Sequence, residues 1–260
     1  MNLYLSKWVA LILLLIIGVG IFFLGNLTSN LSEKVSLLTG SRLVPIYKVD
    51  TSQKKIAITL DGMWGAEYTE DILKVLREHD IKITFFFGGN WLEEYPEMAK
   101  KIAEDGHEIG NHTYSHPHLN SLSRSEIKKE LTKNQEQIEN LVGKQPKVFR
   151  PPFGEYSNKV INVAKKLNFK TIQWSIDSLD WKDPGVDSIV NRVLNKVGPG
   201  DIILMHNNAT VIVEALEILV PKLKKQGYEI VKVSELTYDN NYYIESHSGV
   251  QKKRRNSGEE

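Results

Sequence analysis

Residues 107–116 read HEIGNHTYSH, and this stretch decides how the rest of the chain is interpreted. HEIG is a run of strand length, and His112 and His116 follow it four residues apart. At that spacing two imidazoles can turn their nitrogens toward one point, as a divalent metal requires. A metalloenzyme normally adds a third ligand, often a carboxylate, and leaves a position open for water. The alternative is a pair of ordinary polar loop residues, because H-x-x-x-H is short and occurs by chance.

Strand-length runs and helix-period segments alternate on both sides of this stretch. The expected strands are 55–60, 83–87, 107–110, 147–150, 170–175, 201–205 and 228–233. The expected helices, in which apolar residues return every three or four positions, are 69–79, 96–104, 125–142, 157–167, 186–196 and 211–226. Ser123 and Glu126 predict a capping box before the longest of them. This alternation predicts an α/β fold with a parallel sheet, either a barrel or an open doubly wound sheet.

Ionisable side chains follow five of the expected strands. They are Asp61, the pair His112 and His116, Arg150, the pair Asp177 and Asp180, and His206. Both architectures place active sites at the carboxyl ends of strands. Five strand ends in the expected register are hard to obtain by chance, which favours a functional site over the polar-loop interpretation.

Each of these residues suits a role in hydrolysis and also has a structural alternative. Asp61 can act as a general base or a metal ligand, or it can cap the helix that follows. His206 suits a general acid because its ordinary pKa lies near neutrality, and Asp180 can hold the second nitrogen of that ring. As alternatives, the two are a loop histidine and a turn residue. Arg150, stiffened by the two prolines after it, can orient Asp61 or lie on a rigid surface loop.

Aromatic residues and a proline-rich turn offer further candidates. The turn after Arg150 leaves the amides of Phe153 and Gly154 as candidate oxyanion donors. Aromatic rings at the same rim would suit the C–H faces of sugars, although core packing is the commoner role of a tryptophan. The candidates for this rim are Trp64, Trp91, Trp174 and Trp181.

The composition bounds the class of protein. The 260 residues are 41% hydrophobic and 25% charged, so the chain can bury one sizeable core. A formal net charge of +1 gives no reason to expect a nucleic-acid partner. Cysteine is absent, which excludes disulfides, thiolate zinc sites and a cysteine nucleophile. The sequence does not indicate an oligomeric state.

The N-terminal region predicts a membrane location. Residues 8–25, WVALILLLIIGVGIFFLG, carry no charge and are long enough to cross a bilayer core of about 30 Å. A small-x-small cleavage site does not follow them, so we predict an uncleaved signal anchor, and Lys7 favours a cytoplasmic N-terminus. The predicted organisation is a cytoplasmic end at 1–7, a transmembrane helix at 8–25, a spacer at 26–45, a catalytic domain outside the cytoplasm at 46–240 and a polar tail at 241–260.

The succession ITLD, HTYSH, RPPFG, DSLDW and LMH resembles the polysaccharide deacetylase (NodB-homology) family of carbohydrate esterases. The resemblance implies a deformed, TIM-like (β/α)7 barrel and metal-dependent removal of acetyl groups from an N-acetylated glycan such as peptidoglycan or chitin. It also implies a divalent cation, zinc or another such as cobalt, held by His112, His116 and Asp61. In this scheme Asp61 is also the base that activates water, and Arg150 tethers it.

The same resemblance assigns the remaining roles. Asp180 would support the acid His206, and Trp174 and Leu204 would line the acetyl pocket. Phe153 and Trp181 are further candidates for substrate binding.

One position departs from the family pattern. Members commonly carry two consecutive acidic residues in the first motif, whereas Gly62 follows Asp61 here. Three sources of the missing ligand remain open: Asp61 itself, Glu67 or Glu70, and waters around a two-histidine site. The Trp-Gly pair after Gly62 resembles the sporulation-associated branch. The alternatives to a deacetylase are a glycan-binding protein on a degenerate scaffold and a hydrolase of another carbon–nitrogen bond, such as a cyclic amide.

Overall fold

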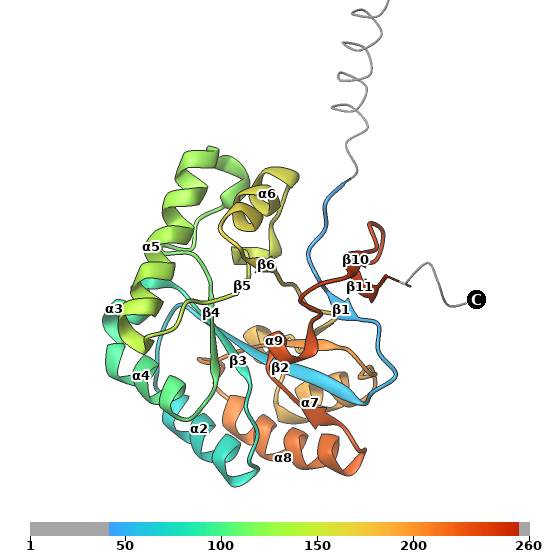
Figure 1. The fold of residues 1–260 in the computed structure, drawn as a ribbon. Coiled ribbons are helices and arrows are strands. Elements are labelled where there is room, and N and C mark those ends of the chain that lie inside the picture. Colours follow the sequence, from blue (N-terminus) through green and yellow to red (C-terminus); the bar gives the residue numbers. More distant parts are fainter. Residues whose placement is uncertain (1–41, 255–260) are drawn as a thin grey trace, which may run out of the picture. The chain divides into compact units, whose positions relative to one another are not determined.

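The computed structural model describes residues 42–254, in which strands and helices alternate along the chain as predicted (Figure 1). The predicted membrane span at 8–25 lies outside these residues, as do the predicted cytoplasmic end and most of the spacer. Within residues 42–254, the structure contains no helix that is both long and apolar enough to cross a membrane.

The six predicted helices are found within two residues of their predicted bounds. They are α2 (Thr69–Glu78), α4 (Pro96–Glu104), α5 (Arg124–Val142), α6 (Asn158–Lys166), α7 (Val186–Leu194) and α8 (Ile212–Lys225). Apolar periodicity did not reveal the short elements α3 (Gly89–Glu94) and α9 (Val233–Leu236), or the 3-10 turns η1 (Leu119–Ser121), η2 (Pro152–Gly154) and η3 (Asp180–Lys182). Such short pieces span too few turns to show a period.

Helix α5 begins and ends on signals in the sequence. The side chain of Ser123 accepts a hydrogen bond from the amide of Glu126, and the Glu126 carboxylate accepts one from the amide of Ser123. This confirms the predicted capping box. At the other end Gly143 has a φ of 69°, a left-handed conformation that glycine adopts without a Cβ penalty.

Parallel strands form one curled sheet in the order β6-β5-β4-β3-β2-β8-β7, and β9 also pairs with the start of β2. The strands are β2 (Lys55–Gly62), β3 (Thr84–Phe87), β4 (Glu108–Asn111), β5 (Val148–Phe149), β6 (Lys170–Thr171), β7 (Ile176–Asp177), β8 (Ile202–His206) and β9 (Glu229–Ile230). The predicted segment 170–175 is a strand only at its start, and β7 follows as a separate strand.

The sheet curls, as the predicted deformed barrel requires, but it does not close. Among the described strands, no pairing joins the edge strands β6 and β7. The chain entering the domain lies at this opening instead: the amide of Ile46 donates to the Thr171 carbonyl at 2.9 Å, and the amide of Gln173 donates to the Ile46 carbonyl at 2.8 Å. The segment around Ile46 thus occupies the Thr171 carbonyl and the Gln173 amide, which a closed sheet would need for pairing with another strand. The fold is therefore a curled parallel half-barrel.

Strand β2 presents different chemistry to its two sides because successive side chains alternate. Ile58 and Leu60 are buried in the large apolar cluster that the sheet forms with its helices. Ala57 belongs to a second apolar cluster, and Thr59 and Asp61 share its side of the strand. The alternation thus carries polar groups toward one mouth of the curl.

Within the predicted polar tail, residues 242–244 and 250–253 form two strands. β10 (Tyr242–Ile244) and β11 (Val250–Lys253) pair antiparallel, and β11 pairs in parallel with β1 (Lys48–Val49). Gln251 is fully buried and exchanges side-chain hydrogen bonds with the backbone of Tyr238 at 2.9 and 2.8 Å. The folded domain also begins before residue 46, since the amide of Leu43 donates to Asn158 Oδ1 at 2.8 Å.

Candidate active site

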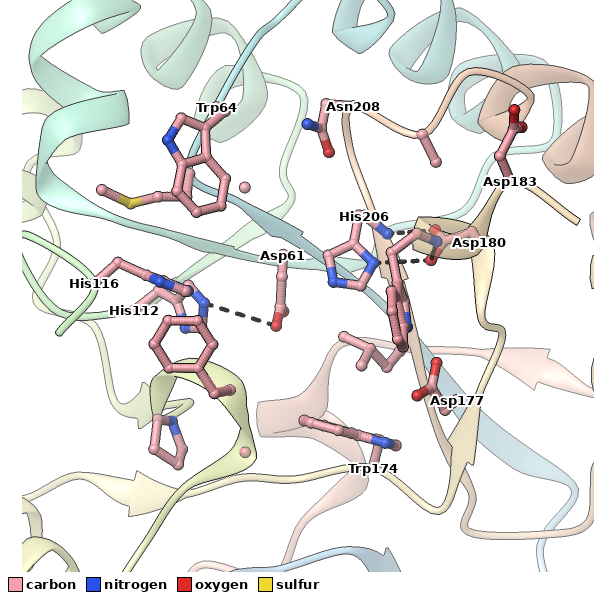
Figure 2. A pocket seen from close by; sticks show the side chains of 18 of the residues that line it. Asp61, Trp64, His112, His116, Trp174, Asp177, Asp180, Asp183, His206 and Asn208 are labelled. Atoms are coloured by element: carbon pink, nitrogen blue, oxygen red, sulfur yellow. Dashed lines mark hydrogen bonds and ion pairs between the residues drawn. The ribbon is translucent and has the colours of Figure 1, made fainter. Parts of the chain in front are cut away.

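The register of the parallel strands brings the predicted residues to one mouth of the curl. β2 pairs with β8 so that Asp61 lies beside His206. β4 pairs with β5, so that His112 and Arg150, just beyond their ends, are neighbours. The cavity at this mouth has a volume of about 650 Å³ (Figure 2). The predicted residues that line it are Asp61, Trp64, His112, His116, Phe153, Trp174, Asp177, Asp180, Trp181, Leu204 and His206.

Arg150 is fully buried and holds Asp61. Its Nη1 donates to Asp61 Oδ1 at 2.6 Å and to Thr59 Oγ1 at 2.8 Å, and its Nη2 donates to the Gln173 carbonyl at 3.1 Å. Burial lowers the pKa of Arg150, and the charge of Asp61 opposes that effect. The guanidinium stays charged at neutral pH because arginine titrates so far above it. One oxygen of Asp61 is thereby fixed, and Oδ2 lies 3.9 Å from His112 Nε2.

His112 and His116 lie together on one side of the cavity, with ring centroids 4.9 Å apart (Figure 2). His112 Nδ1 is 2.8 Å from the Arg150 carbonyl. A carbonyl only accepts, so Nδ1 carries the proton and Nε2 keeps its lone pair, the tautomer that suits a metal ligand. Burial lowers the pKa of both imidazoles, for His116 to about 4. Both rings are therefore neutral at pH 7.

The three predicted metal ligands, His112, His116 and Asp61, all line the cavity. Among residues 42–254, no group of three or more histidine, cysteine, aspartate or glutamate side chains is arranged to hold a metal ion. Asp61 already gives one oxygen to Arg150, and its other oxygen stands 3.9 Å from His112 Nε2. The two imidazoles, with or without this second oxygen, could hold a metal whose remaining positions water would fill.

Neither of the two glutamates considered above lies at the cavity. Glu70 on α2 forms ion pairs with Lys101 at 2.5 Å and with Arg77 at 3.1 Å. Glu67 is exposed, and its carboxylate lies close to Gly65. Neither carboxylate therefore faces the cavity as a metal ligand.

The position after Asp61 is closed by packing. Gly62 lies opposite Phe87 in the ladder of β2 and β3, and a Cβ there would lie 2.4 Å from Phe87 Cε1 and 2.9 Å from Asn207 Oδ1. Phe87 is fully buried and stacks on Trp91 with 3.7 Å between ring centroids and an interplanar angle of 3°. A ring held in this way has little room to move aside.

We expect Gly62→Asp, which would restore the second acidic residue of the family pattern, to destabilise the domain by about 1–3 kcal/mol through overpacking. Urea denaturation of wild type, Gly62→Ala and Gly62→Asp measures the loss. Gly198→Ala is the matched control, because a Cβ there would meet no described atom closer than 3.6 Å. An unchanged denaturation midpoint in both Gly62 variants would show that Phe87 yields easily.

His206 lies between Asp61 and Asp180 in Figure 2. Its Nδ1 is 2.8 Å from Asp180 Oδ1, and its amide donates to Asp180 Oδ2 at 2.6 Å. Burial by itself lowers the pKa of His206. The hydrogen bond to Asp180 and the charges of Asp180, Asp61 and Asp177 together outweigh burial, so the pKa is raised. Asp180, only 2% exposed, thus holds the ring by Nδ1 and favours its protonated form.

Apolar and aromatic side chains complete the cavity. Leu204 is buried and Trp174 half-buried, and both line the wall. Trp64, Phe153 and Trp181 are 62%, 55% and 58% exposed, respectively. Large aromatic side chains exposed at the mouth of a cavity are well suited to binding a ligand.

Two expectations about this rim are wrong. Trp91 is not at the rim but fully buried, and its Nε1 donates to the Gly65 carbonyl at 2.7 Å. The amide of Gly154 is not a free oxyanion donor, because it donates to the Pro151 carbonyl at 3.3 Å. Both are tertiary or turn contacts that local sequence does not reveal.

Polar residues on the loops after η3 and β8 also line the cavity and were not singled out. They are Asp183, Asn208 and Thr210. Thr210 Oγ1 donates to Asp183 Oδ1 at 2.7 Å and so joins the two loops. Loop residues carry no periodic signal. Only Asn208 could have been predicted to line the cavity, because it follows His206 by two residues.

Comparison with known proteins agrees with this geometry. The sequence profile of the polysaccharide deacetylase family matches residues 48–172. The uncharacterised protein YlxY of Bacillus subtilis is 41% identical over 192 residues, which cover 74% of this chain and 60% of YlxY. A peptidoglycan-N-acetylglucosamine deacetylase of Bacillus cereus is 38% identical over 195 residues, which cover 73% of this chain and 91% of the deacetylase.

A solved structure gives the same result for the fold. Wild-type BA3943 from Bacillus anthracis, described as a pseudoenzyme of carbohydrate esterase family 4, matches with a TM-score of 0.72 and 38% identity, over 74% of this chain and 68% of that one. A mutant of BA3943 is described as having restored enzymatic activity. With the deacetylase covered over nearly its whole length, these matches show that the chain belongs to the polysaccharide deacetylase family.

Proposed function

We propose that this chain hydrolyses the N-acetyl groups of a cell-wall glycan, such as peptidoglycan or a chitin-like polymer. The observation that carries the proposal is the pairing of Asp61 with His206 across β2 and β8, each held by its own buried partner. A carboxylate and a protonated imidazole at adjacent strand ends supply a base and an acid on the same cavity.

The proposed reaction uses these two groups in sequence. Asp61 removes a proton from a water whose oxygen attacks the acetyl carbonyl carbon. His206 then donates its Nε2 proton to the amide nitrogen, and the C–N bond breaks to give acetate and a free amine. Without that proton an amine anion would have to leave, which is far less favourable.

The wall and rim of the cavity support a sugar substrate. Leu204 and Trp174 offer an apolar surface for the methyl group of an acetyl substituent. The exposed rings of Trp64, Phe153 and Trp181 suit the C–H faces of neighbouring sugar rings. The named activity of the Bacillus cereus relative also favours a glycan with N-acetylglucosamine units.

The resemblance to the family implies a divalent metal, and the two imidazoles predict only weak binding of it. We expect zinc added to the purified protein to be lost on dialysis against a chelator, because two side chains and waters hold it less firmly than a three-residue set. Metal content after dialysis, measured by atomic emission with His112→Ala as the control, checks this. Zinc retained at one equivalent would point to a third protein ligand.

A second function, glycan binding without hydrolysis, is favoured by two observations. Gly62 replaces an acidic residue of the family pattern, and BA3943, at 38% identity, is described as a pseudoenzyme. The intact pairs of Asp61 with Arg150 and of His206 with Asp180 favour hydrolysis instead.

We also propose the location from the sequence. The apolar residues 8–25 would anchor the chain in the cell membrane as a single span, with the catalytic domain outside the cytoplasm. A domain placed there would face its cell-wall substrate. Protease accessibility of the domain on intact cells would test the orientation.

Acetate release separates the two functions. The full chain is incubated with N-acetylglucosamine oligomers or peptidoglycan, with and without added zinc or cobalt, and acetate is measured enzymatically. Release above the level of a His206→Ala variant supports hydrolysis. Binding of the oligomers with no acetate from any acetylated glycan would instead support the glycan-binding function.

We expect Asp180→Asn to narrow the pH range of activity from its alkaline side. The carboxylate raises the pKa of His206, so its loss lowers that pKa, and the acid then loses its proton at a lower pH. At pH 8 acetate release should fall by about tenfold or more. The pH profile of kcat measures the change, and an alkaline limb at the wild-type position would contradict the role of Asp180.

A further inference from the structure

The loop between the two cavity histidines is held from outside the cavity by helix α5. Glu130 Oε2 accepts hydrogen bonds from the amide of Tyr114 at 3.0 Å and from the amide of Ser115 at 2.8 Å. Its Oε1 accepts one from the Ser115 hydroxyl at 2.9 Å. A single carboxylate thus binds three donors of the segment that connects His112 to His116.

This loop needs such support because its backbone is strained at both ends. Thr113 has a φ of 66° and His116 has a φ of 59°. These are left-handed backbone conformations that residues other than glycine rarely adopt. Local bonds contribute, since Asn111 Oδ1 accepts from the amide of Thr113 and Thr113 Oγ1 accepts from the amide of His116. Neither of these bonds involves the amides of residues 114 and 115, which Glu130 alone binds in the described contacts.

The neighbours of Glu130 on the same face of α5 serve the same region. Lys133 Nζ lies 3.2 Å from the centroid of the Tyr114 ring, and Asn134 Nδ2 donates to the Phe87 carbonyl at 3.2 Å. Positions three and four residues apart share one side of a helix. This polar side of α5 faces the ends of β3 and β4, where an amphipathic helix would otherwise pack apolar side chains.

We propose that Glu130 is a positioning residue for His116. It fixes the left-handed loop that turns the His116 imidazole toward His112 in the cavity, and it touches neither substrate nor reacting atoms. The inference rests on the proposed function only in that the same cavity is concerned, because the position of the imidazole can be measured without any substrate.

The first test observes the ring directly. The full chain is labelled at histidine Cε1 with ¹³C, the His116 signal is assigned as the one missing from His116→Ala, and spectra are compared at one pH. Glu130→Ala should shift or broaden that signal, whereas Glu130→Gln, which keeps an oxygen acceptor, should restore it. The control is Glu136→Ala on an exposed part of the same helix. An unchanged His116 signal in Glu130→Ala, with native circular dichroism, would overturn the proposal.

The second test asks whether the effect passes through His116. Glu130→Ala should lower kcat for acetate release by about tenfold with KM nearly unchanged, since misplacing a cavity group costs turnover more than binding. In a His116→Ala background the same substitution should have no further effect on kcat. Independent losses that multiply would overturn the proposal. If wild type releases no acetate, the proposed function fails, and the spectra still decide the role of Glu130.

Discussion

Asp61→Asn is expected to lower the rate of acetate release from N-acetylglucosamine oligomers by about 10²–10⁴-fold, the contribution of a positioned general base. Asparagine has nearly the size of aspartate, and its amide oxygen can still accept the hydrogen bond that Arg150 donates to Oδ1. It cannot accept a proton from water at neutral pH. The loss should therefore appear in kcat, measured from initial rates at saturating substrate.

The control for this variant is Asp71→Asn. Asp71 lies on the exposed side of α2 and outside the cavity, so the rate of that variant should equal the wild-type rate. Thermal unfolding of both variants separates lost chemistry from lost folding. If Asp61→Asn kept a rate within a few-fold of wild type while folded, another group would have to activate the water.

The helices were predictable because each buries one side against the sheet. In α8, for example, Leu216, Leu219 and Leu223 are fully buried and return every three or four residues. That spacing is visible in the letters alone. The capping box at Ser123 and the left-handed Gly143 fixed the bounds of α5 in the same local way.

The sheet was only partly predictable. Strand β2 is long and apolar enough to be recognised from the sequence. Strands β5, β6 and β7 have two residues each and are defined by pairing with neighbouring strands. The opening between β6 and β7 depends on Ile46, far away in sequence, which pairs with Ile172. Strands β10 and β11 were missed because a small surface sheet keeps a polar composition.

The candidate site was predictable to the extent that strand ends determine it. Asp61 and His206 both lie at the edge where the parallel strands end, but they are direct neighbours in the register of β2 and β8, which the sequence did not predict. Three features depended on tertiary contacts and were not predictable. They are the burial of Trp91, the packing of Phe87 against Gly62, and the hydrogen bonds from the loop between the two histidines to Glu130. Each involves side chains whose partners lie on other elements.

Arg150→Leu is expected to destabilise the domain by about 3–5 kcal/mol, the usual cost of removing one partner of a buried ion pair. Arg150 is fully buried, and its guanidinium donates to Asp61, Thr59 and the Gln173 carbonyl. Leucine removes all of these bonds and leaves the carboxylate of Asp61, which is only 8% exposed, without its counter-charge. Urea denaturation followed by circular dichroism measures the loss.

The same substitution in an Asp61→Asn background shows how much of that loss is electrostatic. With a neutral side chain at position 61, Arg150→Leu leaves no unpaired buried carboxylate. The substitution should therefore lower the free energy of unfolding clearly less in this background than in wild type. Arg77→Leu, which removes an arginine from exposed ion pairs, should change the midpoint little. Equal losses from Arg150→Leu in both backgrounds would mean that the arginine supports the fold through its hydrogen bonds and packing. Its pairing with the proposed base would then contribute nothing to stability.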